Sequence, residues 1–214
     1  NAAKGKYIAF LDSDDFWEKE KVYESVSILE NSETEITYHD CFLVSGPQIK
    51  KTNCRSLIKN SLDDLVVNGN TIITSSVMLS KSRLLEVHSF NENKDMVGWE
   101  DYHLWLKLAN KKSRFYKLDK CLGFCKKGDD NFDNSERVIF NLVEIEKHLR
   151  LHYSEITSVN NIWWIDYTKS KAIMSISKTK KSMLGLIKVI FKKSPVEYKL
   201  KSLLLIIFPF FSRR

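Results

Sequence analysis

The sequence predicts an α/β domain followed by a helical C-terminal region. In the first 124 residues, short apolar or β-branched segments alternate with segments whose apolar residues recur at helical spacing, which is the order typical of an α/β fold. From about Arg137 onward, helical patterns dominate. A chain of 214 residues with 43% hydrophobic residues is long and apolar enough for one folded domain with an appendage.

The expected strands are short and bounded by residues that favour turns. Tyr7–Leu11 is a continuous apolar run between Gly5 and a group of aspartates, which is typical of a buried parallel strand. Residues 36–44 are rich in β-branched and aromatic residues and precede a Gly-Pro pair. The remaining expected strands are residues 71–79 and 114–124.

The expected helices lie between these strands. The first follows Asp15, a candidate N-cap, and its apolar positions are Val22, Val26 and Leu29. Ser61 with Asp64 three positions later predicts a capping box that opens a second helix. Further helices are expected after Ser80 and over residues 102–109.

The positive charge of the chain is concentrated at one end. The net charge is +7, but residues 178–214 contain eight Lys, two Arg and a single acidic residue, Glu197, so the preceding part is mildly acidic. This distribution argues against a basic globular domain that binds nucleic acid. The 4 cysteines form no C-x-x-C pair and have no histidine pair at zinc spacing, so we expect free thiols in a reducing cytoplasm.

The first candidate site is the segment Asp12-Ser13-Asp14-Asp15, at the carboxyl end of the first expected strand. Ligands of open α/β sheets bind at that edge. Three carboxylates this close repel one another unless a cation compensates, and Mg²⁺ or Mn²⁺ prefers oxygen ligands that it shares with substrate phosphates. Spacing alone leaves open an exposed acidic turn that caps the next helix.

The second candidate site is Gly98-Trp99-Glu100-Asp101-Tyr102, at the start of an amphipathic helix. The helix dipole favours the ionised form of a carboxylate in the first turn, and such a group can accept a proton from a substrate hydroxyl. Trp99 could stack on a sugar face. The alternatives are ordinary helix N-terminal charge for the carboxylates and core packing for Trp99.

Taken together, the two sites resemble a known family. Residues 1–17, NAAKGKYIAFLDSDDFW, are similar to the A-x-G-x-Y-I-x-F-L-D-S-D-D-x-W stretch of family 2 glycosyltransferases, and residues 98–109, GWEDYHLWLKLA, are similar to their G-x-E-D-x-x-L-W-L-R-L motif. Residues 68–78 between them resemble a strand of teichuronic-acid and O-antigen type bacterial members. The resemblance covers about residues 1–130.

The resemblance implies a GT-A fold and an inverting transfer from a nucleoside-diphosphate sugar. Asp12 and Asp14 match the positions that bind the donor and a Mg²⁺ or Mn²⁺ ion, and Asp15 supports that loop. Asp101 matches the general base. Glu100 matches a residue that orients the base or the acceptor, and Trp99 is a candidate for acceptor binding.

The sequence also departs from the family pattern. The usual opening strand and the acidic residue that binds the nucleotide base are absent, so we expect a GT-A type mixed sheet that lacks its N-terminal Rossmann-like half. Where many members have Y-R-x-H, this chain has Cys125 and Lys127 in place of the Arg and the His. Lys127 is expected either to neutralise a donor phosphate or to be a solvated loop lysine.

Three regions follow from this interpretation: the C-terminal part of a GT-A catalytic domain at 1–130, a helical extension at 131–177 and a basic tail at 178–214. The tail mixes apolar patches with lysines, which predicts an amphipathic anchor on an anionic membrane. A helical hairpin packed on the catalytic domain, or a surface for a partner, remains an alternative.

The predicted function is inverting sugar transfer to a saccharide acceptor, carried on a polyprenyl lipid, in bacterial cell-surface polysaccharide synthesis. The expected location is the cytoplasm, peripheral on the inner face of the cell membrane, and no nucleic-acid partner is expected. The alternatives are a truncated, non-catalytic remnant and a membrane-surface module whose acidic loop binds Ca²⁺.

Overall fold

The structure of the protein is a computed structural model that describes residues 3–126, 135–177 and 180–208. Its contacts divide the chain into two compact units. The first unit consists of the described residues within 1–65, 70–92 and 100–129. The second consists of those within 66–69, 93–99 and 130–214.

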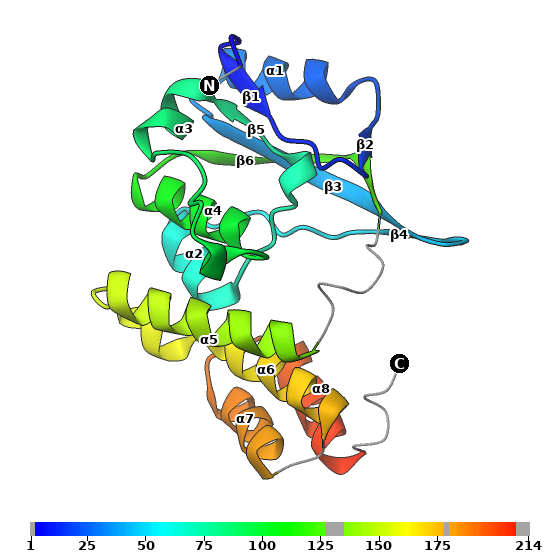
Figure 1. The fold of residues 1–214 in the computed structure, drawn as a ribbon, viewed down its shortest axis with the longest axis vertical. Coiled ribbons are helices and arrows are strands. Elements are labelled where there is room, and N and C mark those ends of the chain that lie inside the picture. The colour runs from blue at the N-terminus through cyan, green and yellow to red at the C-terminus, as the bar shows by residue number, and fades with distance from the viewer. Residues whose placement is uncertain (1–2, 127–134, 178–179, 209–214) are drawn as a thin grey trace. The chain divides into compact units, whose positions relative to one another are not determined.

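The first unit is built on a mixed sheet of six strands. Along the sheet the order is β1-β5-β3-β6-β2, with β4 paired to β3 (Figure 1). The strands β3 and β6 are parallel, and the other described pairs are antiparallel. The strands are β1 (Tyr7–Ala9), β2 (Phe16–Trp17), β3 (Ile36–Ser45), β4 (Gln48–Lys51), β5 (Met78–Ser80) and β6 (Phe115–Lys126).

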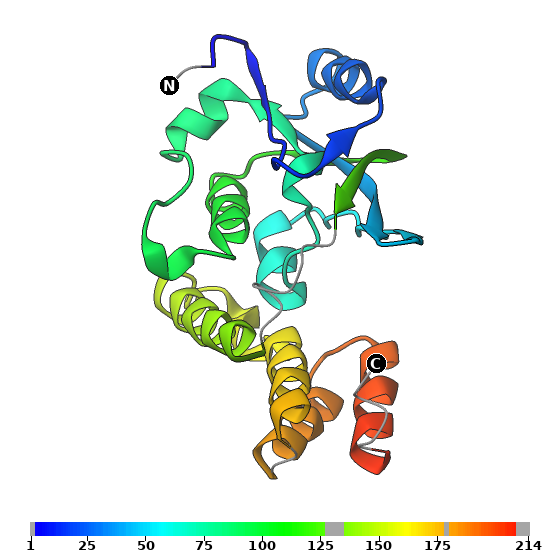
Figure 2. The same cartoon turned by 45° about the vertical axis from the view of Figure 1, so that its right-hand side comes forward.

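Helices flank this sheet. Figure 2 shows α1 on one side of the strands and α4 on the other. The apolar side chains of α4 are nearly all buried, so this helix forms the centre of the core of the first unit. The helical elements of the chain up to residue 110 are α1 (Lys21–Asn31), α2 (Ser61–Asn68), η1 (Thr74–Ser76), α3 (Lys81–Glu86), η2 (Lys94–Met96) and α4 (Glu100–Asn110).

The first expected strand is shorter and less buried than predicted. It ends at Ala9, pairs antiparallel with β5 and has half-buried side chains. The prediction of a buried parallel strand was therefore wrong: the pairing that the structure describes is antiparallel, and the strand is only half-buried. An apolar run of this length shows where a strand forms, but the direction of its partner depends on the tertiary fold.

The first helix also differs from its prediction. Asp15 does not cap it, because β2 intervenes and α1 begins at Lys21. The buried positions of α1 are Lys21, Ser25 and Leu29, whereas Val22 is exposed. The ammonium group of Lys21 donates a hydrogen bond to the carbonyl of Val77 at 3.2 Å, which gives this buried cation a polar partner.

The predicted capping box at the start of α2 does not form. Oδ1 of Asn60 accepts a hydrogen bond from the N–H of Asp63 at 3.3 Å, so Asn60 performs the capping. The carboxylate of Asp64 is instead buried and accepts from Nε of Arg55 at 2.8 Å and from the N–H of Ile58 at 3.0 Å. Asp64 therefore fastens the preceding segment rather than the helix end.

The expected strand at residues 71–79 is mostly another structure. Its centre is the single turn η1, and only Met78–Ser80 joins the sheet. Both Ser75 and Ser76 are buried. The other three expected strands, including residues 36–44 and 114–124, are present in the sheet.

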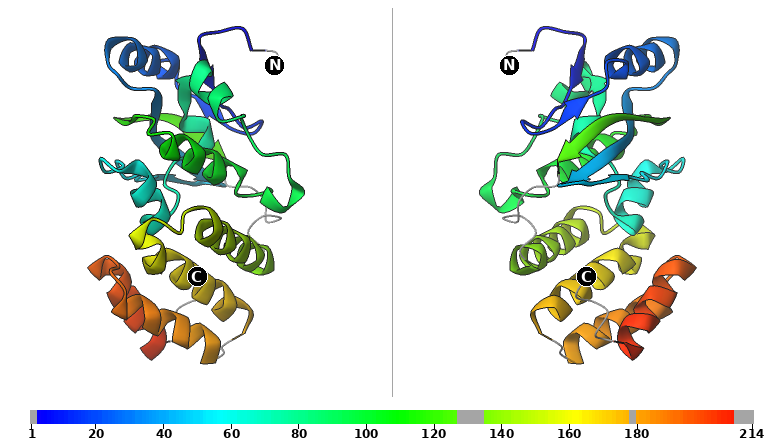
Figure 3. Two further views of the ribbon diagram at one scale, coloured as in Figure 1. Left: turned by 90° about the vertical axis from the view of Figure 1, so that its left-hand side faces the viewer. Right: turned by 90° about the vertical axis from the view of Figure 1, so that its right-hand side faces the viewer.

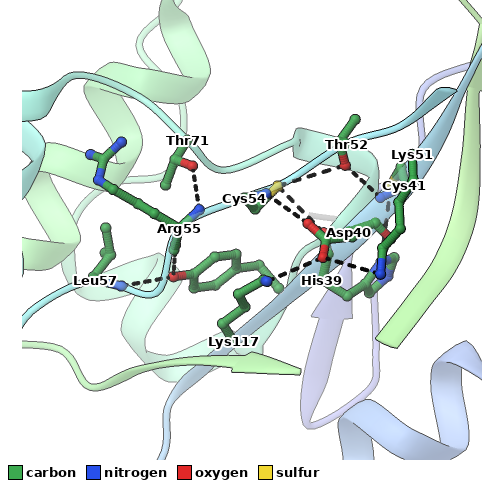
Figure 4. A network of polar contacts seen from close by, with 11 residues as sticks. His39, Asp40, Cys41, Lys51, Thr52, Cys54, Arg55, Leu57, Thr71 and Lys117 are labelled. Atoms are coloured by element: carbon green, nitrogen blue, oxygen red, sulfur yellow. Dashed lines mark hydrogen bonds and ion pairs between the residues drawn. The ribbon is translucent and has the colours of Figure 1, made fainter. Parts of the chain in front are cut away.

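A buried aspartate lies at an irregularity in β3 (Figure 4). The pairing of β3 with β6 shifts register on both sides of Asp40, whose side chain is 3% exposed. Its carboxylate accepts from the N–H of Cys54 at 2.7 Å and lies 3.1 Å from Nζ of Lys117 and 3.9 Å from Nζ of Lys51. Asp40 therefore ties the segment after β4 to the middle of the sheet.

The second unit is helical. Its helices α6, α7 and α8 lie side by side (Figure 3), with α5 packed against α6. Nε1 of Trp163 donates to Oδ1 of Asn68 at 3.2 Å, and Nε1 of Trp164 donates to the carbonyl of Val66 at 3.0 Å. The helical elements are α5 (Ser135–His152), η3 (Thr157–Asn161), α6 (Trp163–Ile176), α7 (Lys180–Phe191) and α8 (Val196–Ile207).

None of the helices within the described ranges has the length and hydropathy needed to cross a membrane.

Candidate active site

The acidic loop predicted to bind the donor follows β1. The N–H of Asp15 donates to the carbonyl of Asp12 at 3.1 Å, which closes the loop into a turn. The N–H of Asp12 donates to Oγ of Ser75 at 3.0 Å, and Oδ1 of Asp15 accepts from the N–H of Lys126 at 2.9 Å. The loop is thus held from two sides, while Asp12 and Asp14 remain exposed.

The carboxylates of this loop repel one another. The pKa of Asp12 is raised, first because its carboxyl loses part of its hydration and then because the charges of Asp15, Asp14 and Glu100 disfavour its ionised form. The hydroxyl of Ser75 acts in the opposite direction. The loop therefore concentrates negative charge that a bound cation would relieve.

Asp101, the predicted general base, lies in the first turn of α4. Its Oδ2 accepts hydrogen bonds from Oγ1 of Thr74 at 3.1 Å and from Nδ2 of Asn70 at 3.3 Å. Its Oδ1 accepts from the N–H of Tyr102 at 2.5 Å, and the hydroxyl of Tyr102 donates to the carbonyl of Leu65 at 2.7 Å. Three donors therefore hold the carboxylate in one orientation, on a helix end that is itself anchored.

The environment of Asp101 places its pKa close to the range in which a base is useful. Burial raises the pKa to about 6, the charge of Glu100 adds to this rise, and the hydrogen bonds from Tyr102, Thr74 and Asn70 oppose it. At neutral pH the carboxylate is ionised and can accept a proton. A pKa somewhat below the working pH suits a general base.

Glu100 and η1 connect the two predicted motifs. The charge of Glu100 raises the pKa of both Asp12 and Asp101, so the carboxylates of the loop and of the helix belong to one electrostatic cluster. Thr74 donates to Asp101, while its neighbour Ser75 accepts from the backbone of Asp12. Two consecutive residues of η1 thus hold both motifs.

Sequence reasoning did not identify Asn70, Thr74 or Ser75 as site residues. The available signal was the polar run from Thr74 to Ser76 inside a segment expected to be a strand. Such a run is unusual in a buried strand, because each polar side chain then needs a partner. Here Thr74 and Ser75 find their partners in the two predicted motifs, and the hydroxyl of Ser76 donates to the carbonyl of Ile73.

Trp99, the predicted acceptor-binding residue, is buried. Trp99 is 4% exposed; its Nε1 donates to the carbonyl of Asp95 at 3.0 Å, and its ring meets that of His148 edge to face at 5.5 Å. This burial favours the packing alternative over stacking on a sugar. Lys127 lies outside the described residues.

The composition of the cluster fits a hard divalent cation. Asp12 and Asp14 would supply oxygen ligands, and a bound cation would relieve the repulsion between Asp12 and its neighbouring carboxylates. Within the described ranges, no three His, Cys, Asp or Glu side chains are arranged to hold a metal ion by themselves. Mg²⁺ commonly takes one or two protein carboxylates and completes its shell with substrate phosphates and water, so two aspartates are sufficient.

A pair of thiols lies on the strands beside the acidic loop. The pKa of Cys41 is lowered to about 6, chiefly because the thiol of Cys125 donates a hydrogen bond to it, and Nδ1 of His39 lies 4.0 Å from its sulfur. The same hydrogen bond and burial raise the pKa of Cys125. None of the four cysteines forms a disulfide bond in the structure.

Part of the chain is similar in sequence to known proteins. Residues 1–83 match the family model described as glycosyl transferase family 2. A curated relative from Escherichia coli, UDP-Glc:alpha-D-GlcNAc-diphosphoundecaprenol beta-1,3-glucosyltransferase WfaP, is 29% identical over 119 residues, which is 51% of this chain and 41% of the relative. The chain therefore spans about two fifths of the length of that relative.

The fold is similar to that of a solved structure. TarS 1-349 from S. aureus, in complex with UDP-GlcNAc, matches over 99% of this chain and 65% of its own, with a TM-score of 0.54 and 15% identity. This likeness confirms the predicted fold class, an α/β structure with a GT-A type mixed sheet followed by helices. The similarity to glycosyl transferase family 2 is carried by residues 1–83, the part of the chain that its family model matches.

Proposed function

We propose that this chain contains the base and the donor-binding loop of an inverting glycosyltransferase that uses a nucleoside-diphosphate sugar. The observation that carries the proposal is that Thr74 and Ser75 connect the two carboxylate motifs. Thr74 binds Asp101 and Ser75 binds Asp12, although these two aspartates are 89 positions apart in the sequence. One motif has the chemistry of a cation and diphosphate site, and the other has a carboxylate whose orientation and pKa suit proton abstraction.

The proposed reaction assigns the proton transfer to Asp101. Its ionised Oδ atoms accept the proton of an acceptor hydroxyl while that oxygen attacks the anomeric carbon of the donor sugar. The bond between this carbon and the diphosphate oxygen breaks, and the electron pair leaves with the nucleoside diphosphate. Because attack and departure take place on opposite faces, the anomeric configuration inverts.

The acidic loop would bind the diphosphate end of the donor. Asp12 and Asp14 would hold Mg²⁺ or Mn²⁺, which when bound neutralises negative charge on the departing diphosphate. Asp15 supports the loop through its hydrogen bond from Lys126. A phosphate contact from Lys127 stays a prediction.

The acceptor is proposed to be a saccharide on a polyprenyl diphosphate. Support comes from the relative in Escherichia coli, a glucosyltransferase named for an alpha-D-GlcNAc-diphosphoundecaprenol acceptor. Such an acceptor would place the enzyme on the cytoplasmic face of the cell membrane, in the assembly of a surface polysaccharide. The metal dependence of this chain is part of the same proposal.

A transfer assay tests the proposal directly. The chain would be incubated with Mn²⁺ or Mg²⁺, a panel of UDP and GDP sugars and a GlcNAc-diphosphoprenol acceptor, and the anomeric configuration of the product would be read from its NMR coupling constants. We expect metal-dependent transfer with inversion. A product that retains the configuration of the donor would rule out the proposed direct attack.

Two variants separate the transferase from the alternatives. Asp14→Ala should abolish metal-dependent donor binding in calorimetry, whereas Asp119→Ala, an exposed aspartate on β6, should leave it unchanged. Binding of Ca²⁺ or Mn²⁺ without any gain in nucleotide affinity would instead support an interaction module. Donor binding with no transfer to any acceptor would support a non-catalytic remnant.

A further inference from the structure

The helix α7 leaves an apolar stripe on its outer face. Its buried residues are Ser182, Leu186 and Val189, which face the rest of the second unit. At one-turn intervals on the opposite face lie Leu184, Ile187 and Phe191, and Phe191 is 85% exposed. This face is a continuous apolar stripe rather than a scatter of single side chains.

The helix α8 carries a second stripe of the same kind. Val196, Leu200, Leu203, Leu204 and Ile207 are all exposed, with Val196 at 71%. Their spacing of three or four positions places them on one side of the helix, opposite the buried Ser202. Two neighbouring helices therefore expose eight large aliphatic or aromatic side chains.

Both helices are fixed through their inner faces, so the described residues of the unit leave the stripes uncovered. A Cβ added to Gly185 of α7 would lie 2.0 Å from Oγ of Ser170, so α7 approaches α6 as closely as a glycine allows. On α8, the ring of Tyr198 packs on Trp163 at 4.6 Å and on Tyr167 at 5.1 Å. Turning either stripe inward would break these contacts.

Lysines border the stripes. Lys188 lies one turn from both Leu184 and Phe191, and Lys199 lies one turn from both Val196 and Leu203. Lys180 and Lys181 are exposed at the start of α7. The single acidic residue among the described positions 180–208 is Glu197, and it pairs with Lys201. The surface therefore combines apolar side chains with cations and almost no negative charge.

We infer that the outer faces of α7 and α8 bind an anionic lipid surface, with the stripes in the headgroup layer and the bordering lysines on lipid phosphates. An amphipathic helix with a lysine-rich border binds anionic leaflets through both forces. A protein partner that fits eight apolar groups would have to be acidic around its rim, whereas an anionic leaflet presents both properties everywhere. The inference rests on the proposed function in one respect only: a membrane is where the proposed lipid-linked acceptor would reside.

The test is vesicle binding by the full chain, measured by flotation. We expect binding to vesicles that contain phosphatidylglycerol, weaker binding to pure phosphatidylcholine, and loss of the difference at high salt. Phe191→Ser with Leu200→Ser should weaken binding by about tenfold or more, because two large apolar side chains no longer enter the headgroup layer. The matched control is Tyr23→Ser with Leu151→Ser, which removes equally exposed apolar side chains elsewhere.

A charge-reversal pair tests the electrostatic part. Lys181→Glu with Lys188→Glu should lower affinity for phosphatidylglycerol vesicles by tenfold or more, on the basis of about fivefold for each lysine removed near such a surface. Lys50→Glu with Lys94→Glu, two exposed lysines of the same kind, should have little effect. All substituted side chains are exposed, so unchanged circular dichroism and melting temperature are the check that the variants fold.

Several outcomes would overturn the inference. The first is that the wild type does not bind anionic vesicles, and the second is that the Phe191→Ser, Leu200→Ser variant binds them as well as the wild type. The third is that the wild type self-associates and these substitutions abolish the self-association, which would assign the surface to a second copy of the chain. Vesicle binding needs neither donor nor acceptor. If the chain catalyses transfer but does not bind vesicles, the membrane inference is wrong and the proposed transferase function is unaffected. If it binds vesicles but catalyses no transfer, the membrane inference is supported and the proposed function is not.

Discussion

The hydroxyl of Thr74 donates a hydrogen bond to Oδ2 of Asp101 at 3.1 Å. This contact stabilises the ionised form of the carboxylate and also limits its rotation, so it acts on both the pKa and the orientation of the proposed base. Because the adjacent Ser75 holds the acidic loop, a shift of η1 would disturb both motifs at once.

Replacing Thr74 should move the acid limb of the activity profile to higher pH. In Thr74→Val the carboxylate loses a donor to its charged form, so its pKa rises from about 6 by roughly one unit, which corresponds to the loss of one charge-assisted hydrogen bond. The midpoint of kcat/KM against pH reports this change. Thr34→Val, outside the cluster, is the control, and an unshifted midpoint in Thr74→Val would contradict the assignment of Asp101 as the base.

Replacing Glu100 should have the opposite effect. Glu100→Gln removes a charge that raises the pKa of Asp101, so the acid limb should move to lower pH, whatever happens to the maximal rate. The shift should be smaller than that caused by Thr74→Val, because repulsion by Glu100 contributes less than the bond from Thr74. Glu92→Gln provides the comparison. If the acid limb of the activity profile moved in the same direction in Glu100→Gln and Thr74→Val, the limb would report the titration of a group other than Asp101.

Asp101→Asn should strongly slow transfer and stabilise the fold. Loss of a general base lowers kcat by about 10²-fold to 10⁴-fold, while donor affinity should persist because the acidic loop is intact. The pKa of Asp101 is raised in the folded state, so its favourable contribution to stability is complete below about pH 4 and is lost as the pH rises through about 6.

At pH 7 the ionised Asp101 is therefore a burden on the fold, and a neutral amide should raise the free energy of unfolding by about 1–2 kcal/mol, allowing for partial contact with solvent. Denaturant titrations at pH 4 and pH 7 measure this, and the gain should vanish at the lower pH. A variant that is less stable at pH 7, or that cannot bind donor, would contradict the proposed role.

Removing the partner of Asp40 should weaken the sheet. Lys117→Met leaves the buried carboxylate without its closest cation, at a cost of about 3–5 kcal/mol in unfolding free energy. Lys51→Met removes a lysine that lies 3.9 Å from the same carboxylate but is mostly exposed, so it should cost less than about 1 kcal/mol. Urea unfolding distinguishes the two, and equal effects would show that Asp40 is not stabilised by Lys117.

Some elements of the fold could be predicted because their signals are local. The β-branched and aromatic residues of β3 favour an extended chain wherever they pack, and the strand extends over Ile36–Ser45 as the pattern indicates. The same holds for the first turn of α4, where Glu100 and Asp101 were expected. For residues 71–79 the β-branched composition was a misleading signal, because Thr74 and Ser75 of η1 bind distant partners instead of lying in a strand.

By itself, the sequence determined the residue types at the site and their order: an acidic loop after an apolar segment, and a carboxylate pair opening an amphipathic helix. Only the tertiary structure decided that Thr74 and Ser75 join them, that Trp99 is buried and that Lys21 rather than Val22 faces the core. The physical reason is that these contacts join residues far apart in the sequence. The two hydrogen bonds of η1, for example, join residues that are 27 and 63 positions apart. Local propensity does not indicate which distant donor will reach a given carboxylate, so it cannot predict the pKa of that carboxylate.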